Sequence, residues 1–513
     1  MTSKTLSPDD QCEVISFLAD PATHGGARVE HVETHGAHIF LAGETALKIK
    51  RAVRYDYLDF STLEKRQAML RRELDLNRAA APEIYRDLVP VTRESDGRLA
   101  LDGAGIAVEW ALRMRRFPAQ AELSAIAARG ALDDRLADAL GHVVAAYHDR
   151  AESRDADGGE LMLSILQQLR DAFAGMSDLL DRSHVQLFNV IADARLKVLM
   201  PLLVARARAG FVRRVHGDLH LGNIVLIEGR PVPFDALEFN ERLATCDVLY
   251  DLAFLLMDIC HRDLRRAANR VLSAYLFAAE GAQDSGVMLL PFFMAVRAAI
   301  RAMVVIQTGK ARGDTAKARL EAGAYLDDAL AMLAPHAPRL IAVGGRSGTG
   351  KTVLAGALAP HMGGPCGGVH LRSDLERKAM ASVSAETRLP PEHYTKKSSE
   401  QVYLRMFDRA EALLRAGASV VLDAAFLDPA ERAEVRALAS KLAVPFDGIW
   451  LEAEPDQLVT RVTARKGDAS DADARVVHKQ HTFDVGQIDW CRVDASDTAN
   501  VTLARAQAAI GLA

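Results

Sequence analysis

The motif GRSGTGKT at residues 345–352 constrains this chain most, because it fits G-x-x-x-x-G-K-[ST] without a mismatch. An apolar run at 340–343 precedes it and a helix-forming run at 353–358 follows, which predicts a strand, a phosphate-binding loop and a helix. Glycines let backbone N–H groups face phosphate oxygens, while the lysine reaches the β and γ phosphates and the last hydroxyl can ligate Mg2+. The residues that we expect to bind a nucleoside triphosphate are Gly345, Ser347, Gly348, Thr349, Gly350, Lys351 and Thr352.

A second stretch, distant in sequence, has the spacing of a kinase catalytic loop. Residues 216–223 read HGDLHLGN, which fits H-x-D-x-x-x-x-N, and a further aspartate follows the apolar residues 232–234. An aspartate after a strand can accept the proton of an attacking hydroxyl, and an asparagine and a second aspartate can hold the Mg2+ that bridges ATP phosphates. Asp218, Asn223 and Asp235 are the candidates for these three roles.

Such a site also needs a lysine on a strand, paired with a glutamate on the next helix, so that the ammonium faces the α and β phosphates. Lys48 ends an A-x-K pattern within a predicted strand at residues 45–50, and Glu73 lies in a helical run at residues 63–78. Lys50 competes with Lys48, since side chains two residues apart lie on the same face of a strand. The alternative is a solvated basic strand.

The stretch 215–258 resembles the aminoglycoside phosphotransferase family, which has the protein-kinase-like fold. The whole chain is similar to bacterial proteins that join such a domain to a C-terminal P-loop domain of the AAA, zeta-toxin or gluconate-kinase type. The resemblance implies Asp218 as catalytic base, Asn223 and Asp235 as Mg2+ ligands, and Lys48 with Glu73 as a phosphate clamp. The chain departs from protein kinases because no G-x-G-x-x-G precedes the lysine, Ala-Leu replaces Phe-Gly after the second aspartate, and no A-P-E segment appears.

Strand ends in the C-terminal region supply further candidates. Asp374 could accept a proton from a substrate hydroxyl, or it could only cap the following helix. Asp423 has the position of a Walker B acid that orients Mg2+. Arg461 and Arg465 could form a lid over the transferring phosphate, or they could be a solvated helix face. This set resembles the small P-loop kinases, such as gluconate kinase, chloramphenicol phosphotransferase and the polynucleotide 5′-kinase group, and the lack of an NKXD sequence favours ATP.

Periodicity divides the chain into three parts. Residues 1–115 combine short strands with one helix, and residues 116–335 show apolar positions at helical spacing. Residues 336–513 alternate strands and helices, which predicts a parallel sheet with crossover helices. The predicted fold class is therefore α/β and α+β multidomain: a bilobal protein-kinase-like fold, then a P-loop parallel sheet with helices on both faces.

Three local predictions accompany this division. Residues 109–117 should cross between the two lobes. Asp247 and Asp251, one helical turn apart, should hold the catalytic loop by hydrogen bonds, the alternative being a pocket for a cationic substrate. The polar residues 386–400 are predicted to be a substrate loop, although their composition equally suits an inert connector.

Composition limits the remaining classes. A chain of 513 residues is too long for one core, and its 26% charged and 49% hydrophobic content is that of a globular enzyme. Five scattered cysteines without C-x-x-C spacing indicate reduced thiols. The N-terminus lacks a signal-peptide core, and the apolar stretch 287–306 contains a proline and two arginines, which disfavours a membrane span. We therefore expect a cytoplasmic location, no membrane association, and, from the net charge of -5, no nucleic-acid partner.

The leading hypothesis is an ATP- and Mg2+-dependent phosphotransferase with two nucleotide sites, which transfers the γ-phosphate to hydroxyls of small molecules and needs no obligate protein partner. A second hypothesis makes the P-loop domain a regulatory nucleotide-binding module attached to a single kinase domain. A third treats the N-terminal part as a degenerate scaffold, against which the intact set of catalytic candidates argues.

Overall fold

The computed structural model describes residues 9–34, 36–55, 58–464 and 469–512, and the chain divides into two compact units. Unit 1 contains residues 1–132, 147–156 and 210–251, and unit 2 contains 133–146, 157–209 and 252–513. Two helices, α4 (Asp134–Arg150) and α7 (Val248–His261), carry the chain from one unit to the other. Each unit is described by itself.

Unit 1 is built on a six-stranded antiparallel sheet with the order β1-β2-β3-β8-β6-β7. The strands are β1 (Val29–Glu33), β2 (Ala37–Ala42), β3 (Thr45–Lys50), β6 (Tyr85–Arg93), β7 (Leu99–Leu101) and β8 (Ile106–Arg115). The helix α1 (Asp9–Ala19) buries Val14 and Leu18 against one face of this sheet. The helix α2 (Leu63–Arg78) packs against β6 and β8, and it begins where the Thr62 hydroxyl accepts a hydrogen bond from the Lys65 amide.

Successive side chains of β3 point to opposite faces of the sheet, and this alternation determines which of them contact α2. Leu47 and Ile49 belong to the core shared with α1, so Lys48 and Lys50 face the opposite side, where α2 lies. The sequence predicted β3 and α2 with these bounds. The prediction that residues 109–117 cross between lobes is wrong for 109–115, because these residues belong to β8 and Glu109 is buried against Arg66 at 2.8 Å.

The rest of unit 1 carries short elements around the predicted catalytic loop. Strand β9 (Val212–Arg214) pairs with β12 (Thr245–Asp247), and β10 (Ile224–Ile227) pairs with β11 (Arg230–Pro233). The remaining elements are η1 (Pro21–His24), β4 (Arg54–Tyr55), β5 (Leu58–Asp59), η2 (Ala119–Ala121), α3 (Leu123–Ala128) and η3 (Leu221–Asn223).

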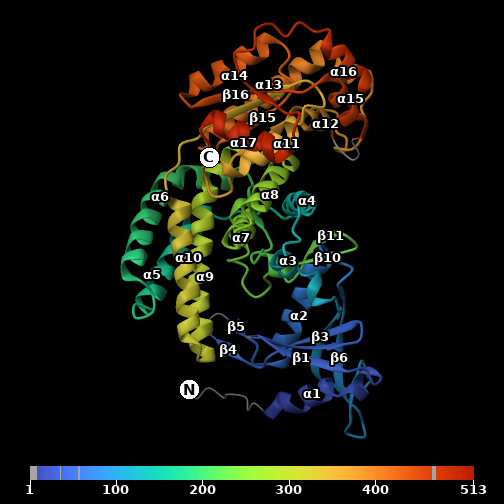
Figure 1. The fold of residues 1–513 in the computed structure, drawn as a ribbon. Coiled ribbons are helices and arrows are strands. Elements are labelled where there is room, and N and C mark those ends of the chain that lie inside the picture. Colours follow the sequence, from blue (N-terminus) through green and yellow to red (C-terminus); the bar gives the residue numbers. More distant parts are fainter. Residues whose placement is uncertain (1–8, 35, 56–57, 465–468, 513) are drawn as a thin grey trace. The chain divides into compact units, whose positions relative to one another are not determined.

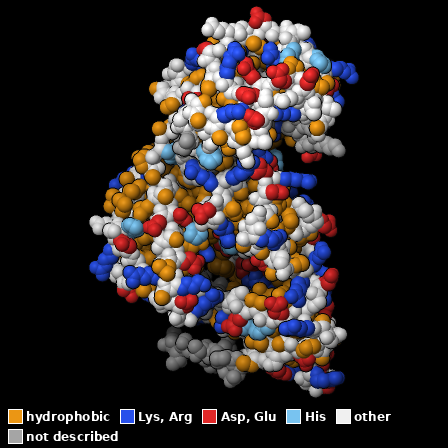
Figure 2. Space-filling model, viewed as in Figure 1, with side chains coloured by type: hydrophobic (Ala, Val, Ile, Leu, Met, Phe, Trp, Pro, Cys, Tyr) orange, Lys and Arg blue, Asp and Glu red, His pale blue; other side chains and the backbone are white. Residues whose placement is uncertain are grey.

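Unit 2 contains a group of long helices. They are α5 (Gly158–Ala174), α6 (Arg182–Arg208), α8 (Arg265–Ala278), η4 (Asp284–Leu289), α9 (Leu290–Arg312) and α10 (Thr315–Leu333). Helices α9 and α10 form a tight hairpin (Figure 1), and a Cβ on Gly309 would lie 2.3 Å from the Ala318 Cβ, so this close approach requires glycine. Large apolar side chains stay exposed on α5 and α6, where Figure 2 shows hydrophobic atoms gathered; they are Leu163, Leu187, Val190 and Val198.

Among the described residues, the segment Asp284–Arg312 alone is long and apolar enough to cross a membrane. Its most apolar window is 67% buried inside the structure, as in the core helix of a globular unit. The segment therefore gives only weak evidence for a membrane span.

The C-terminal part of unit 2 is a five-stranded parallel sheet with the order β14-β15-β13-β16-β17, as the alternating pattern predicted. Its strands are β13 (Leu340–Gly345), β14 (Val369–Arg372), β15 (Val420–Asp423), β16 (Phe446–Glu452) and β17 (Cys491–Asp494). Its helices are α11 (Lys351–Leu358), η5 (Ala359–His361), α12 (Ser373–Met380), η6 (Pro391–Tyr394), α13 (Lys396–Arg415), α14 (Pro429–Leu442), α15 (Pro455–Ala464), α16 (Ala474–His481) and α17 (Ala499–Ile510).

Helices cover both faces of this sheet (Figure 1). Ile449 and Leu451 pack in one core with α11 and α17, while the intervening Trp450 faces the other side, where the Arg432 guanidinium of α14 stacks on its ring. The predicted fold class is confirmed: a kinase-like part is followed by a P-loop-type parallel sheet with helices on both faces.

Candidate active sites

The lysine and glutamate of the predicted phosphate clamp lie together in unit 1. The Lys48 ammonium is 2.7 Å from Glu73 Oε1 and 2.8 Å from Asp235 Oδ1. Burial alone would lower the pKa of Lys48, but Asp235 and Glu73 outweigh it and hold that pKa well above its ordinary value. The side chain is therefore a permanent cation directed at the loop that carries Asp235.

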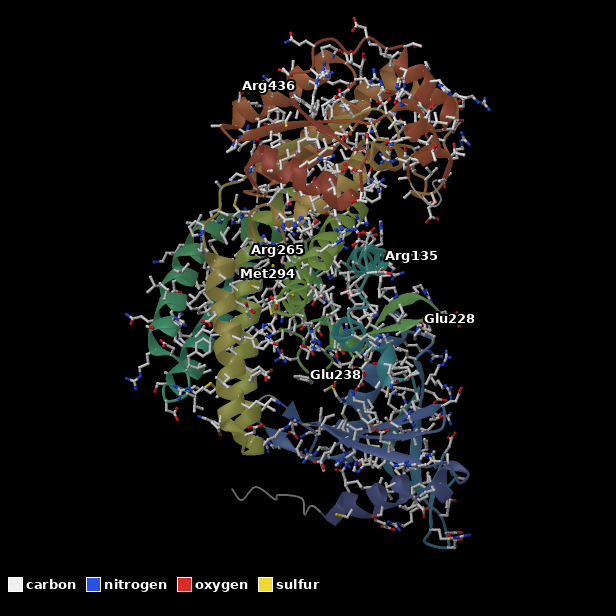
Figure 3. The ribbon with its side chains drawn as sticks, viewed as in Figure 1. Arg135, Glu228, Glu238, Arg265, Met294 and Arg436 are labelled. Carbon is white, nitrogen blue, oxygen red and sulfur yellow. The ribbon has the colours of Figure 1, made fainter. Side chains whose placement is uncertain are left out.

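Lys50 contacts the same glutamate. Its ammonium lies 2.6 Å from Glu73 Oε2 and 2.5 Å from Glu238 Oε1, and all three side chains are buried. Glu238, labelled in Figure 3, follows β11, and burial raises the pKa of its carboxyl. The sequence presented the two lysines as competitors, whereas the structure gives each lysine one oxygen of Glu73. No motif pointed to Glu238.

Asp235 has a strained backbone that two neighbouring side chains support. Its φ of 61° lies in the left-handed region, which costs a non-glycine residue about 1–3 kcal/mol. Its amide donates to the Tyr85 hydroxyl oxygen at 3.0 Å, and the next amide, of Ala236, donates to Asn77 Oδ1 at 2.7 Å. Burial raises the pKa of Asp235, but Lys48 outweighs it, so the pKa stays below its ordinary value. Tyr85 and Asn77 carried no sequence signal.

Asp218 and Asn223 are joined within the catalytic loop. The Asn223 amide nitrogen donates to Asp218 Oδ2 at 3.0 Å and to the Asp218 carbonyl at 2.9 Å. Because this nitrogen is committed to Asp218, the oxygen is the part of the Asn223 amide that suits a metal ion. His216 Nε2 lies 2.9 Å from the Phe234 carbonyl, so the loop is tied to the strand that leads to Asp235.

The prediction that acidic residues of α7 hold the catalytic loop is confirmed for one of them. Asp251 accepts hydrogen bonds from the backbone amides of Gly217 at 2.9 Å and His216 at 3.3 Å, and it is fully buried. Asp247 instead accepts from the Leu249 amide at 2.9 Å, at the start of α7. Both carboxylates thus have structural partners.

The donor set of this site fits a hard divalent cation. Asp218, Asn223 and Asp235 present carboxylate and amide oxygens, which Mg2+ prefers. The charge of Asp218 reaches Asp235, where it partly opposes the lowering of the Asp235 pKa by Lys48. Among the described residues, no group of three or more His, Cys, Asp or Glu side chains is arranged to hold a metal. A metal here would therefore depend on the asparagine and on ligand oxygens as well as on the two aspartates.

The loop at 345–352 in unit 2 adopts backbone conformations with positive φ, which glycine reaches without strain. Gly348 and Gly350 have φ of 88° and 90°, and a Cβ on Gly348 would lie 2.6 Å from the Leu458 carbonyl oxygen. The Arg346 carbonyl accepts from the Thr349 hydroxyl at 2.8 Å and from the Lys351 ammonium at 3.1 Å. Lys351 and Thr352 begin α11, so the loop leads directly into a helix N-terminus.

One side chain outside the motif binds this loop. The Ser347 amide donates to Gln480 Oε1 at 2.7 Å, and Arg346 Nε donates to the Gln480 carbonyl at 3.3 Å. Helix α16 carries Gln480. The Gln480 side-chain oxygen therefore accepts from the Ser347 N–H, a donor that would otherwise be available to a phosphate. The motif itself gave no indication of this residue.

Asp423 is the last residue of β15, and Asp374 lies two residues after the end of the neighbouring strand β14. His370 Nε2 is 3.4 Å and Arg372 Nε is 3.7 Å from Asp423 Oδ2. Burial would raise the pKa of Asp423, but these two groups hold it at about 2. Burial and then the Asp423 charge raise the pKa of Asp374. The capping alternative for Asp374 is wrong as stated, because the N-cap position of α12 belongs to Arg372.

The predicted lid is described only in part. Arg461 donates to the Ala495 carbonyl at 2.8 Å and to the Ser496 carbonyl at 3.4 Å, while Arg465 lies outside the described residues. Beyond that gap, Asp471 accepts from Lys378 at 2.6 Å and from the Leu389 amide at 3.0 Å. The Tyr394 hydroxyl also donates to Asp471, so this carboxylate binds the segment 386–400 at two points.

Comparison with known families defines the class to which these two sites belong. Residues 58–285 match the family model described as "Phosphotransferase enzyme family", and residues 340–483 match the one described as "AAA domain". The chain thus joins a phosphotransferase domain to a C-terminal P-loop kinase-like domain, as the sequence predicted. The first match indicates a phosphotransferase, and the second agrees with the nucleotide-binding loop at 345–352.

The similarity to complete proteins covers nearly the whole chain. Uncharacterized proteins of Mycobacterium tuberculosis (strain H37Rv) and Mycobacterium bovis are 28% identical over 477 residues, which is 91% of this chain and 92% of each relative. The two domains therefore occur together in those proteins.

Solved structures resemble the two parts separately. A gluconokinase from Sinorhizobium meliloti has 20% identity and a TM-score of 0.26, covering 34% of this chain and 94% of that one. A choline/ethanolamine kinase family protein from Mesorhizobium loti has 14% identity and a TM-score of 0.37, covering 63% and 99%.

Proposed function

We propose that this protein is a kinase with two ATP and Mg2+ sites, each of which transfers a γ-phosphate to the hydroxyl of a small molecule. The observation that carries the proposal is the double contact of Lys48, whose ammonium bridges Glu73 and Asp235 in unit 1. A buried cation that links the glutamate of one element to the candidate metal ligand of another is the arrangement that phosphate positioning needs.

In unit 1, Lys48 would bind phosphate oxygens while Glu73 fixes the direction of its ammonium. Asn223 and Asp235 would hold Mg2+, which when bound neutralises charge on the phosphates. Asp218 would accept the proton of the attacking hydroxyl. Its bond to the Asn223 amide orients the carboxylate for that task.

In unit 2, the backbone of residues 345–352 and the Lys351 ammonium would hold the phosphates of a second nucleotide. Thr352 and Asp423 would provide the metal site, and the low pKa of Asp423 keeps it anionic for this role. Asp374 would accept the proton of the second acceptor, since a raised pKa brings a carboxyl closer to the range of a general base. Arg461 and Arg465 remain our candidates for stabilising the transferring phosphate.

A second candidate function is supported by Gln480. Because its side chain already accepts a hydrogen bond from the loop amide of Ser347, unit 2 could sense nucleotide binding without transferring phosphate. In that case the P-loop domain regulates the single kinase site of unit 1.

We also propose the division into residues 1–115, 116–335 and 336–513 as N-lobe, helical C-lobe and P-loop domain. The acceptors would be small molecules in the cytoplasm, with no nucleic-acid or obligate protein partner. No disulfide joins the five cysteines, all of which lie within the described residues.

Substrate-dependent ADP release decides between the two candidate functions. The intact protein is assayed against pooled aminoglycosides, sugars, nucleosides and amino alcohols, beside Asp218→Asn and Lys351→Ala. Loss of different pools in the two variants establishes a double kinase and names the substrate classes. If Lys351→Ala abolishes no transfer and only changes the rate of the other site, the P-loop domain is regulatory.

A further inference from the structure

Two cysteines far apart in sequence meet inside unit 2. Cys260 lies in the last turns of α7, and Cys366 lies in the loop between η5 and β14, 106 residues later. Their sulfur atoms are 4.0 Å apart. Both are free thiols, Cys366 buried and Cys260 partly exposed.

Two side chains of α8 bind the backbone around Cys366. The buried Asn269 amide donates to the Cys366 carbonyl at 2.8 Å and to the Gly368 carbonyl at 2.7 Å. Arg265 donates to the Gly364 carbonyl at 2.6 Å. Since both donors lie on α8, the contact between the two thiols is fixed by secondary structure rather than by a free loop.

The glycines of this loop give its backbone conformational freedom around Cys366. Its sequence, GGPCGG at 363–368, places glycines on both sides of the cysteine, and Gly364 and Gly367 have positive φ values. Cys366 Sγ also contacts Met294 Sδ at 3.8 Å, and thioether side chains adapt readily to small shifts. A disulfide needs the sulfurs to approach to about 2.05 Å, which side-chain rotation and a small backbone shift can supply.

A cavity gives solvent access to Cys260. It has a volume of about 290 Å³, and its lining includes Cys260, Arg265, Asp328, His336 and Pro365. Arg265 and Met294, which flank the thiols, are labelled in Figure 3. A small peroxide can therefore reach Cys260, whereas Cys366 lies behind it.

We propose that Cys260 and Cys366 form a reversible disulfide when the protein meets a peroxide. The Cys260 thiolate attacks the peroxide, one oxygen forms a sulfenic acid on Cys260, and the other leaves as water or an alcohol. The Cys366 thiol then attacks the Cys260 sulfur, the S–S bond forms, and the sulfenic oxygen leaves as water. Two thiols are oxidised for each peroxide reduced.

The order of the two thiols follows from their surroundings. The hydrogen bond with Cys260 and burial raise the pKa of the Cys366 thiol well above its ordinary value, so Cys366 is the poorer first nucleophile. Its sulfur lies 4.0 Å from that of Cys260, and this proximity places it to resolve the sulfenic acid that forms on its neighbour.

The test is a mapped disulfide in the intact chain. Fully reduced protein is treated with hydrogen peroxide, the remaining thiols are alkylated, and the protein is digested without reductant. Trypsin alone leaves Cys246 and Cys260 on one peptide, residues 243–262, so an Asp-N digestion before Asp258 separates them. We expect a linked pair of peptides, 258–262 with 352–372, that has lost two hydrogens and disappears with dithiothreitol.

Matched variants and a second readout complete the test. Cys260→Ser and Cys366→Ser should both lose the linked peptide, whereas Cys491→Ser should keep it. The oxidised wild type should unfold at a higher temperature than the reduced form, because the link closes a long loop in the unfolded chain, and Cys366→Ser should lose this shift. Wild-type protein in which Cys260 and Cys366 stay alkylatable after peroxide, or in which Cys260 becomes a sulfinic acid without the link, overturns the proposal.

Discussion

Lys48 and Lys50 make a natural comparison at the scale of single residues, because both bind Glu73 but only Lys48 reaches Asp235. We expect Lys48→Met to lower kcat/KM of the unit 1 transfer by about 100-fold or more, as loss of a positioned cation at a phosphoryl site does. Lys50→Met should act mainly on stability, since it leaves Glu238 buried without its lysine. ADP release and thermal unfolding of both variants measure the two effects, and equal losses of activity would contradict the assignment.

Glu431 makes the free energy of unfolding depend on pH. Burial raises the pKa of this carboxyl from 4.5 to about 7 in the folded protein. Between these values the folded state holds a proton that the unfolded state releases, so the stabilisation is full below pH 4.5 and is lost as the pH rises through 7. Glu431→Gln should therefore gain about 2 kcal/mol of stability relative to wild type between pH 5 and pH 8.

Urea unfolding at several pH values checks this expectation, with Glu434→Gln, an exposed residue of the same helix, as control. The control should change little across the range. A Glu431→Gln curve parallel to wild type would show that this carboxyl does not titrate near neutral pH in the folded chain.

At the scale of elements, helix α16 competes for the phosphate loop through Gln480. Removing the amide should free the Ser347 N–H for a phosphate, and one hydrogen bond of about 1 kcal/mol corresponds to roughly 5-fold tighter nucleotide binding. Equilibrium binding of a fluorescent ATP analogue to Gln480→Ala measures this, with the exposed His478→Ala on the same helix as control. Weaker binding would mean that Gln480 turns its amide toward the nucleotide.

Elements with strong periodicity were predictable, and short ones were not. The sequence predicted β3 and α2 with their observed bounds, because apolar spacing and turn residues agree there. It missed β7, β4 and β5, whose two or three residues are too few to show a period. The expected crossing at 109–117 is wrong for 109–115, which belong to β8, where Glu109 pairs with a buried Arg66 from a distant segment.

Contacts between segments that are distant in sequence limit what the sequence revealed of the two sites. Motifs with fixed spacing supplied Asp218, Asn223 and the loop at 345–352. Supporting residues came from distant segments: Asn77 binds the amide of a residue 159 positions away, and Gln480 binds one 133 positions away. No local pattern encodes such pairs, since they exist only once the chain has folded.

At the scale of the whole molecule, one buried arginine connects the helices of unit 2 to its parallel-sheet part. Arg409 on α13 lies 2.8 Å from Asp284 of η4 and 2.6 Å from Glu376 of α12, and it donates to the Leu276 carbonyl at 3.0 Å. All three charged side chains are buried. Burial raises the pKa of Asp284, so this carboxylate depends on the arginine for its charge.

We therefore expect Arg409→Leu to destabilise unit 2 by about 3–5 kcal/mol, because it leaves two buried carboxylates without their cation. Arg405→Leu is the matched control, since Arg405 contacts the same Glu376 at 2.8 Å from a more exposed position and should cost about 1 kcal/mol or less. Urea unfolding is followed with and without an ATP analogue. The analogue stabilises the part of the protein that unfolds cooperatively with the loop at 345–352. If Arg409→Leu splits the transition so that the analogue protects only one part, the arginine is what makes the helices and the sheet unfold as one unit. An Arg409→Leu protein that unfolds like the Arg405→Leu control would show that other contacts, such as the hydrogen bonds of Asn269 with the loop before β14, are enough to join them.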